Sequence, residues 1–189
     1  MTILDVDIRP FNPRDASERE FVGRSDFYNR LLAEQMPLFP PVSAEERKAG
    51  WQNMPAFIEG DYWNIWDALG LAVVASAYVN FARLPENRHV IEFDIAILPE
   101  YRRQGLARRL LERVVALPQR EGRRLMIGWT NSRIPAGEAF MRRIGAQQGL
   151  IERTSVLEVA DLNRELMCQW QEQAQQSASD FELGLWDGS

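Results

Sequence analysis

The spacing of apolar residues predicts two helices near the N-terminus of this chain. Asp15 or Ser17 is a suitable cap for a first helix that runs through Leu32. Ser43, followed by Glu46 three residues later, has the spacing of a capping box, in which each residue's side chain bonds the backbone of the other. We therefore predict a second helix that begins directly after Ser43.

A different periodicity, in which apolar and polar residues alternate, predicts strands in the middle of the chain. Segments rich in aromatic and β-branched residues lie at 62–67, 71–81 and 90–98, with turn-forming residues between them. Three such segments in series predict an antiparallel meander. Residues 3–9 alternate in the same way and predict an opening strand.

After these strands, the apolar residues recur with the period of an α-helix. Apolar side chains within Leu106–Val115 share one helical face, and Pro118 is expected to end this helix. A compact strand at 124–130 follows, and then a helix from Pro135 that is closed by Gly145. Strand, helix and strand in this order form a β-α-β unit, so its two strands are expected to be parallel.

The C-terminal part of the chain has a weaker pattern. Leu150–Val159 predicts one further strand or two short ones, and 162–175 predicts a polar helix. We therefore expect a main domain at 1–160, followed at 161–189 by this helix, a linker and a short strand at Phe181–Trp186. That last strand fits either the start of a second domain or a strand exchanged within a homodimer.

Composition and charge narrow the function classes. The chain has 189 residues and a net charge of −5, so neither nucleic acid nor a membrane surface is expected as a partner. One cysteine and one histidine argue against an internal disulfide and against a metal centre built on these ligands. The sequence shows no export signal and no apolar run of membrane-spanning length, so we expect a cytoplasmic protein.

The segment between the strand at 90–98 and the next helix is the best candidate for chemistry. Arg102, Arg103 and Gly105 lie where a strand ends and a helix begins, so free backbone N–H groups and the positive end of the helix dipole point at one place. Such a place binds phosphate. Gly105 and the small Ala107 allow close approach, and both arginines can add charged hydrogen bonds.

Two common phosphate-binding motifs do not fit this segment, because the sequence lacks the Gly-Lys-Ser/Thr of a Walker loop and the three spaced glycines of a dinucleotide fingerprint. The stretch 102–107, which reads Arg-Arg-Gln-Gly-Leu-Ala, resembles the Gln/Arg-x-x-Gly-x-Gly/Ala motif of the GNAT N-acetyltransferase superfamily. The resemblance covers about residues 5–160. It implies an α/β (α+β) fold with a mixed, mostly antiparallel sheet that is flanked by helices and splayed between the fourth and fifth strands.

The resemblance also implies where acetyl-CoA, the acetyl donor of this family, would lie. Its pantetheine arm would occupy the opening in the sheet and hydrogen-bond the backbone of Ile95, Ala96 and Ile97. Asn131 would contact the cofactor further along. The pyrophosphate would be held by the loop and the helix start, which comprise Arg102, Arg103, Gln104, Gly105, Leu106, Ala107 and Arg108.

An amine acceptor in this family attacks the thioester directly, so a base must take a proton from it. Glu92 and Asp94 alternate on one face of the strand that leads to the motif, and either is a candidate for this base. The alternative is that both are exposed or paired with arginines. Met141 stands where the family usually has a tyrosine that acts as the general acid. Tyr78, on the neighbouring strand, is a substitute candidate or simply a packed residue.

Two functions follow from the resemblance. The first is an acetyl-CoA-dependent N-acetyltransferase that acetylates a primary amine of a small molecule or a protein. The alternative is a non-catalytic acetyl-CoA-binding or structural domain, such as the N-terminal half of a tandem protein, and Met141 fits it too. Five aromatic residues are candidates for an acceptor pocket or for core: Trp51, Tyr62, Trp63, Trp66 and Trp129.

Overall fold

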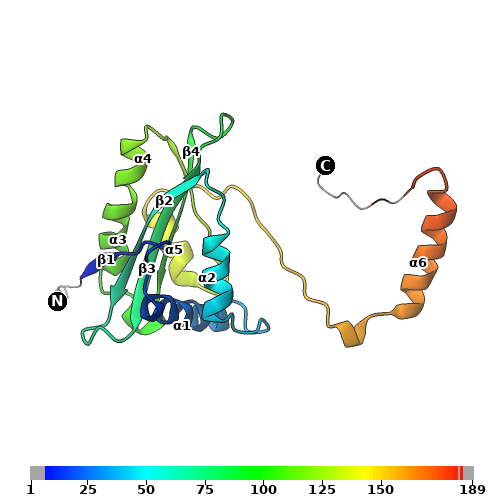
Figure 1. The fold of residues 1–189 in the computed structure, drawn as a ribbon, viewed down its shortest axis with the longest axis horizontal. Coiled ribbons are helices and arrows are strands. Elements are labelled where there is room, and N and C mark those ends of the chain that lie inside the picture. The colour runs from blue at the N-terminus through cyan, green and yellow to red at the C-terminus, as the bar shows by residue number, and fades with distance from the viewer. Residues whose placement is uncertain (1–6, 183, 185–189) are drawn as a thin grey trace. The chain divides into compact units, whose positions relative to one another are not determined.

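The structure of the chain, a computed structural model, describes residues 7–182 and residue 184. The chain divides into two units between Ala146 and Gln147. The first unit holds the sheet and five α-helices, and the second holds one long helix (Figure 1). Within the described part of the chain, no helix is long and apolar enough to cross a membrane.

Five strands form one mixed sheet in the order β1-β2-β3-β4-β5. Their bounds are β1 (Ile8–Pro10), β2 (Ile58–Trp66), β3 (Val73–Ala82), β4 (Val90–Ile97) and β5 (Leu125–Ile127). Strands β1 to β4 are antiparallel neighbours, which confirms the predicted meander. Strand β5 is parallel to β4, as the β-α-β pattern predicts. The expected fold class is therefore confirmed.

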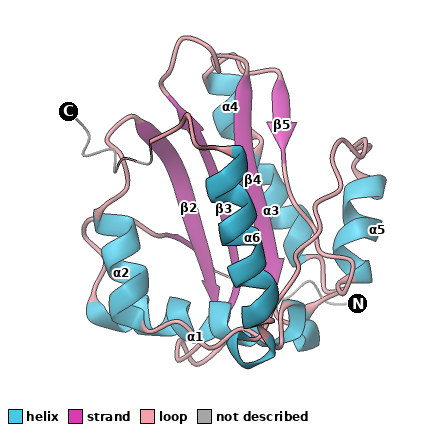
Figure 2. Cartoon of the chain, turned by 90° about the vertical axis from the view of Figure 1, so that its right-hand side faces the viewer, coloured by secondary structure: helices cyan, strands magenta, loops and turns pink. Residues whose placement is uncertain are grey.

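Helices cover both faces of this sheet. Helices α1 (Glu18–Gln35) and α2 (Ala44–Gln52) lie against one face, and α3 (Leu106–Val114) and α4 (Ala116–Arg120) lie against the other (Figure 1). Helix α5 (Pro135–Arg143) lies beyond β5, on the side away from β4 (Figure 2). The sheet is thus the middle layer of three.

Capping boxes set the starts of α1 and α2. The box at Ser43 confirms the prediction for α2, and of the two caps predicted for α1 the structure has Ser17. The side chains of Ser17 and Ser43 accept hydrogen bonds from the backbone N–H groups of Glu20 and Glu46. In return, the two glutamate carboxylates accept from the backbone N–H groups of the serines, both at 2.9 Å. Each box satisfies two donors that a helix end leaves open.

The larger core lies between the sheet and α3. Alternate residues of β3 and β4 point toward α3, because side chains alternate between the faces of a strand. The buried members of this core are Ile65, Val74, Ala75, Ala77, Val79, Phe81, Ile91, Phe93, Leu106, Leu110, Val114 and Leu117. The face under α1 and α2 has smaller apolar clusters and also buries the polar side chains of Arg24, Asn64 and Ser76. The polar groups of the sheet therefore gather on one face.

The pairing between β4 and β5 is short, which opens the sheet. Residues 90–92 pair with residues 125–127, and the described ladder ends there. Beyond Glu92, β4 continues to Ile97 with β3 on one side and no described strand on the other. The sheet is therefore splayed between its fourth and fifth strands, as expected.

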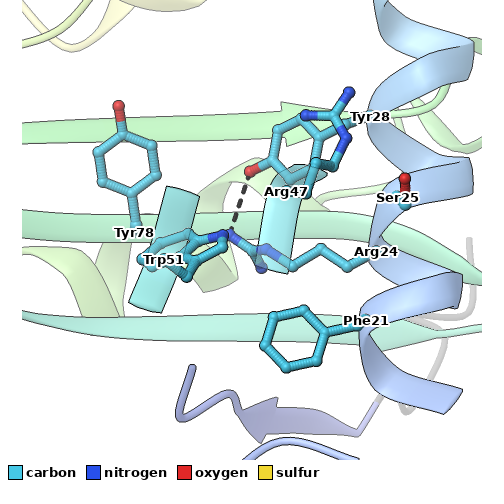
Figure 3. Close-up of a pocket in the computed structure, with 7 residues that line it drawn as sticks. All are labelled: Phe21, Arg24, Ser25, Tyr28, Arg47, Trp51 and Tyr78. Carbon is cyan, nitrogen blue, oxygen red and sulfur yellow. Dashed lines mark hydrogen bonds between the residues drawn. The ribbon is translucent and has the colours of Figure 1, made fainter. Parts of the chain in front are cut away.

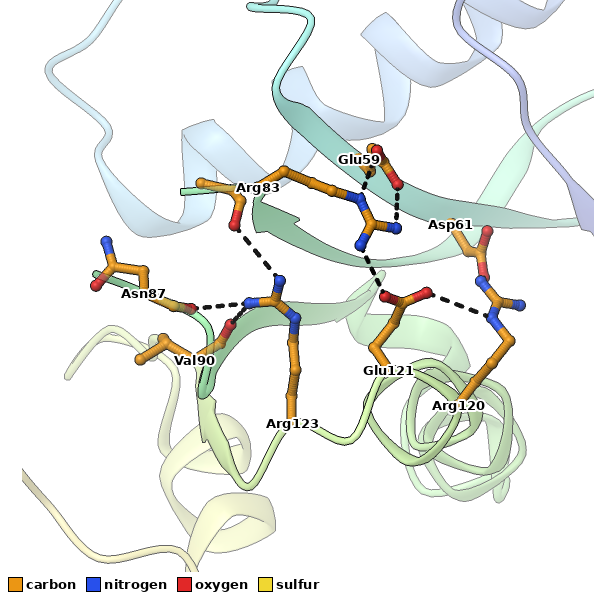
Figure 4. A network of polar contacts seen from close by, with 9 residues as sticks. Glu59, Asp61, Arg83, Asn87, Val90, Arg120, Glu121 and Arg123 are labelled. Carbon is orange, nitrogen blue, oxygen red and sulfur yellow. Dashed lines mark hydrogen bonds and ion pairs between the residues drawn. The ribbon is translucent and has the colours of Figure 1, made fainter. Parts of the chain in front are cut away.

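An arginine closes the other end of this opening (Figure 4). Arg123, two residues before β5, donates hydrogen bonds to the carbonyl oxygens of Asn87 (2.9 Å) and Val90 (2.6 Å) at the start of β4. Its guanidinium also lies 3.8 Å from the ring centroid of Phe81. These contacts hold the start of β5 beside the start of β4, so the two strands diverge only at their far ends.

Two predicted elements differ from the structure. Pro118 does not end the helix that begins at Leu106. That helix ends at Val114, and Pro118 is the third residue of α4, where an N–H would have no helical partner in any case. The predicted strand at 150–159 is wrong: these residues are exposed and form no strand, because no described strand lies beside them to complete a ladder.

Three other predicted boundaries shift. The strand predicted at 3–9 is described only as β1, since residues 1–6 lie outside the described residues. Strand β5 has three residues instead of the seven at 124–130. Half of the strand predicted at Phe181–Trp186 falls on residues outside the described part, and its described residues form no strand. The second unit has α6 (Arg164–Ser177), which confirms the predicted polar helix.

Replacing Arg123 with methionine should lower the free energy of unfolding by about 1–2 kcal/mol, because the partly buried Val90 carbonyl and the exposed Asn87 carbonyl lose a charged donor. Arg120→Met is the matched control. Arg120 is exposed, and its ion pairs with Asp61 and Glu121 span 3.7 and 3.8 Å, so its loss should change stability by less than about 1 kcal/mol. Urea unfolding measures both. Equal effects of the two variants would contradict the role given to Arg123.

Candidate active site

The loop between β4 and α3 presents a row of unpaired backbone donors. After the short 3-10 helix η1 (Pro99–Tyr101), Arg103 has φ 62° and Gly105 has φ 84°, both left-handed. Gly105 is also the N-cap of α3 and supplies no side-chain cap. Among the described residues, no acceptor bonds the N–H groups of residues 103–108. A concave row of free donors at the positive end of a helix binds anions.

Arg103 is the unusual residue of this loop. A left-handed backbone at a residue other than glycine is uncommon and strained, and such strain gathers at functional sites. The Arg103 side chain is exposed and forms no ion pair with a described residue. Arg108, also exposed, has only a long ion pair of 3.5 Å with Glu112. These two cations are available to a bound anion.

Arg102 and Gln104 point elsewhere. The Arg102 guanidinium forms a bidentate pair with Glu34 of α1 at 2.7 and 2.5 Å, and its Nε donates to the Ile97 carbonyl at 3.0 Å. The Gln104 amide donates to the Glu100 carbonyl at 3.0 Å. The sequence predicts a charged phosphate contact for Arg102, but the structure engages this side chain in tying the loop to α1 and to the end of β4.

The backbone of β4 alternates between β3 and the opening. Leu98 donates its N–H to the Val74 carbonyl on β3, so the groups of Ala96 face β3 as well, while those of Ile95 and Ile97 face the opening. The Ile97 carbonyl already accepts from Arg102. Of the three residues predicted to bind the pantetheine arm, Ile95 has the carbonyl best placed for it.

Asp94 and Tyr78 face each other across β4 and β3, on the sheet face under α1 and α2. Burial raises the pKa of the Asp94 carboxyl to about 6, although a hydrogen bond from the Ile95 N–H and the charge of Arg24 work against this rise. Burial also raises the pKa of the Tyr78 hydroxyl, and the negative charge of Asp94 adds to the effect. Near neutral pH, Asp94 is thus an ionised base beside a protonated tyrosine.

The remaining predicted residues have distinct surroundings. Glu92 is exposed, lies opposite Asn80 in the ladder, and forms no ion pair with a described residue. The Asn131 side-chain oxygen accepts from the Arg133 N–H at 2.9 Å and shapes the turn before α5. Met141 packs against the large core, so it supplies contact area and no proton.

A pocket of about 170 Å³ lies beside Tyr78, under α1 and α2 (Figure 3). Its lining comprises Phe21, Arg24, Ser25, Tyr28, Arg47, Trp51 and Tyr78. Of the five aromatic candidates, only Trp51 lines this pocket. The others are core residues or, in the case of Trp129, half-exposed.

Sequence reasoning missed the two arginines of this pocket. Arg24 lies three residues after Phe21 and seven before Leu31, on the apolar stripe of α1, and that position was the available signal. A cation on a buried helical face requires compensation inside the fold. Arg47, on the short and polar helix α2, carried no comparable signal.

Known proteins share this fold. The model of the acetyltransferase (GNAT) family matches residues 27–146, well over half of the chain. The class that the fold and the loop define is thus that of the GNAT acetyltransferases, and the chain belongs to this family. No curated protein matches its sequence.

Solved structures from several organisms have the same fold. A GNAT superfamily phosphinothricin acetyltransferase from Sinorhizobium meliloti, in complex with acetyl-CoA, is 23% identical with a TM-score of 0.61, and 82% of each chain is covered. A Salmonella typhimurium protein with its cofactor acetyl-CoA is 18% identical with a TM-score of 0.55, covering 75% of this chain and 79% of that one. An N-acetyltransferase from Staphylococcus aureus Mu50 is 17% identical with a TM-score of 0.56, and the match covers 74% of this chain and 82% of that one.

Replacing Gly105 with alanine should lower the free energy of unfolding by about 1–2 kcal/mol, because a side chain is strained in the left-handed region. A Cβ there meets no atom within 4 Å, so backbone conformation is the whole effect. Gly50→Ala is the control, since Gly50 lies in α2 and its added Cβ also meets no atom. That change should stabilise the protein by about 0.5–1 kcal/mol. Changes of the same sign in urea unfolding would refute this reading of the loop.

Proposed function

We propose that this protein transfers the acetyl group of acetyl-CoA to a primary amine. The observation that carries the proposal is a juxtaposition around β4. The strand opens toward β5, it leads into a row of free donors at the start of α3, and its Asp94 is a carboxylate with a pKa of about 6. Membership of the GNAT acetyltransferase family and neighbours solved with acetyl-CoA support the same conclusion.

The donor would be seated by backbone and charge together. The N–H groups of residues 103–108 would hold its pyrophosphate, with Arg103 and Arg108 adding charged contacts. The pantetheine arm would enter the opening beside β4 and meet the Ile95 carbonyl. The Asn131 amide would contact the donor further along. In this seat the backbone supplies most of the contacts, and the side chains of Asn131 and Arg108 also have other interactions within the fold.

Asp94 and Tyr78 would divide the proton transfers. The amine nitrogen forms a bond to the acetyl carbon of the thioester while Asp94 takes the proton that this nitrogen loses. As the carbon–sulfur bond breaks, Tyr78 gives its proton to the sulfur. Proton exchange with water then returns Asp94 and Tyr78 to their starting states. The products are the N-acetylated amine and CoA, so atoms and charge balance.

Acetyl-CoA binding tests the donor seat. At a concentration one hundred times Kd, acetyl-CoA should raise the free energy of unfolding by about 2.7 kcal/mol, because it binds the native state. Arg103→Gln should weaken binding about tenfold through the loss of a charged contact. Arg113→Gln is the control, since Arg113 is exposed in the last turn of α3, away from the free donors. Equal Kd values for the two variants would argue against Arg103.

The pH profile tests the base. Since only the ionised carboxylate accepts a proton, log kcat/KM should bend near pH 6, and Asp94→Asn should lose this bend and about 10²- to 10⁴-fold in rate. Glu92→Gln is the matched control and should keep both the bend near pH 6 and the wild-type rate. The raised pKa also means that the folded protein binds this proton more tightly than the unfolded chain. Stability therefore falls as pH rises toward 6, and Asp94→Asn should be the more stable protein at pH 7.

A non-catalytic acetyl-CoA-binding domain is the second candidate, and Met141 favours it. The Met141 side chain packs against the larger core and offers no proton donor at the position where the family usually has a tyrosine. Thiol release with a broad panel of amines separates the two functions. Binding of acetyl-CoA without release for any amine would establish the second candidate. Release that depends on both an amine and Asp94 would establish the first.

A further inference from the structure

A buried cation crosses the pocket beside Tyr78. Arg24 extends from α1 between the rings that line the pocket and is only 3% exposed (Figure 3). Its Nη1 donates to the Asn64 side-chain oxygen at 2.6 Å and to the Ser76 hydroxyl at 2.8 Å, and its Nη2 donates to the Tyr28 hydroxyl at 3.3 Å. Every one of these acceptors is neutral. The Nε of Arg24 is buried and has no partner among the described residues.

A second cation enters the same pocket from α2. The guanidinium of Arg47 donates one hydrogen bond, to the Asn29 side-chain oxygen at 2.9 Å, and lies 5.5 Å from the ring centroid of Tyr28. Its Nε is also buried without a partner among the described residues. Burial lowers the pKa of Arg47 most, and the like charge of Arg24 lowers it further. Two positive charges thus repel each other across one small space.

No carboxylate of a described residue pairs directly with either arginine, although the charge of Glu46 acts on Arg47 from a distance. None of the ion pairs within 4 Å includes Arg24 or Arg47. Glu46 neighbours Arg47 along α2, but its carboxylate caps Ser43. Asp94 feels the charge of Arg24 without pairing with it. Buried charges without a counter-ion are unfavourable, and an anion that enters the pocket removes this penalty.

The pocket has two chemically different ends. One end has Tyr78, whose ladder partner is Asp94, and the other has Arg47 beside Tyr28, with the Arg24 guanidinium between the two ends next to Trp51 (Figure 3). A molecule with its amine at the Tyr78 end, toward Asp94, and its anion beside Arg47 matches both ends. At about 170 Å³, the pocket is smaller than the roughly 300–1,000 Å³ of sites for drug-sized ligands, so this molecule is small.

We propose that the acceptor is a small amine that also carries an oxyanion, such as a carboxylate, which Arg47 binds with Arg24 as the second positive charge. The inference rests on the proposed function and names the substrate class of that site. Arg47 makes the direct contact, because its guanidinium has the fewer partners. Arg24 is already held by three neutral groups and supplies mainly positive potential.

Matched acceptors test the charge requirement. Each set has an α-amino acid, its carboxamide and the amine that lacks the carboxyl carbon, over several side chains, with aminophosphonates as a second oxyanion. CoA release gives kcat/KM for each. The acid should exceed its carboxamide by about ten- to a hundredfold, the value of one charged hydrogen-bonded contact. A carboxamide preferred over its acid would overturn the proposal, and the phosphonates show which oxyanion fits better.

Variants assign the effect to Arg47. Arg47→Met should bring the acid-to-carboxamide ratio of kcat/KM close to one, and Arg47→Lys should keep an intermediate ratio, because an ammonium holds the charge without the fork. Lys48→Met, which removes the next cation of α2 but no lining residue, should leave the ratio unchanged. Circular dichroism and urea unfolding check that each variant is folded. A wild-type ratio in folded Arg47→Met would overturn the assignment.

Binding of the products separates this inference from acetyl transfer itself. Calorimetry of the CoA-loaded protein with an N-acetyl amino acid and with its N-acetyl carboxamide reports the anion site without turnover. Tighter binding of the acid, without thiol release from any amine, would support the anion site and refute the transferase. Thiol release from neutral amines, with no preference for acids, would support the transferase and refute the anion site. Failure of both measurements would refute both proposals.

Discussion

The early end of the β4–β5 ladder is the constraint on which the rest of the structure depends. The backbone N–H and C=O groups of a strand inside a sheet normally hydrogen-bond to the strands on both sides. Strand β4 has a neighbour on both sides only as far as Glu92. Past that point its outer groups face an opening, which leads directly to the uncapped start of α3. Arg123 holds the closed end of the opening through the carbonyl groups of Asn87 and Val90. The contacts of Arg123 therefore make the split part of the fold.

The two faces of the sheet have separate tasks. The face toward α3 is apolar and continuous from β2 to β4, so it holds the strands rigidly behind the opening. The face toward α1 and α2 buries Arg24, Asn64 and Ser76 and brings Asp94 opposite Tyr78. Burial on that face raises the pKa of Asp94, and burial also makes arginine charges without a paired carboxylate unfavourable there. The apolar packing against α3 thus stabilises the sheet, while the face under α1 and α2 has the buried polar groups.

Local patterns carried most of the secondary structure. The Ser-x-x-Glu spacings at Ser17 and Ser43 act within one helical turn, so they locate α1 and α2 without reference to the rest of the chain. The stretch at 150–159 shows the limit of such reasoning. Its alternation is compatible with a strand, but a strand exists only beside a partner, and the described residues provide none.

By itself, the sequence determined the order of the strands and main helices up to Gly145, the parallel β-α-β unit and the place of the loop before α3, because caps, periodicity and a left-handed glycine act over a few residues. It also placed Asp94 and Tyr78 on strands but could not tell which of Asp94 and Glu92 is the more buried. Only the tertiary structure decided that, because α1 and α2 close over the sheet beside Asp94, and this burial raises the pKa of its carboxyl group. The same closure brings Arg24 and Arg47 into one pocket, although 23 positions separate them in the chain and no local pattern relates them.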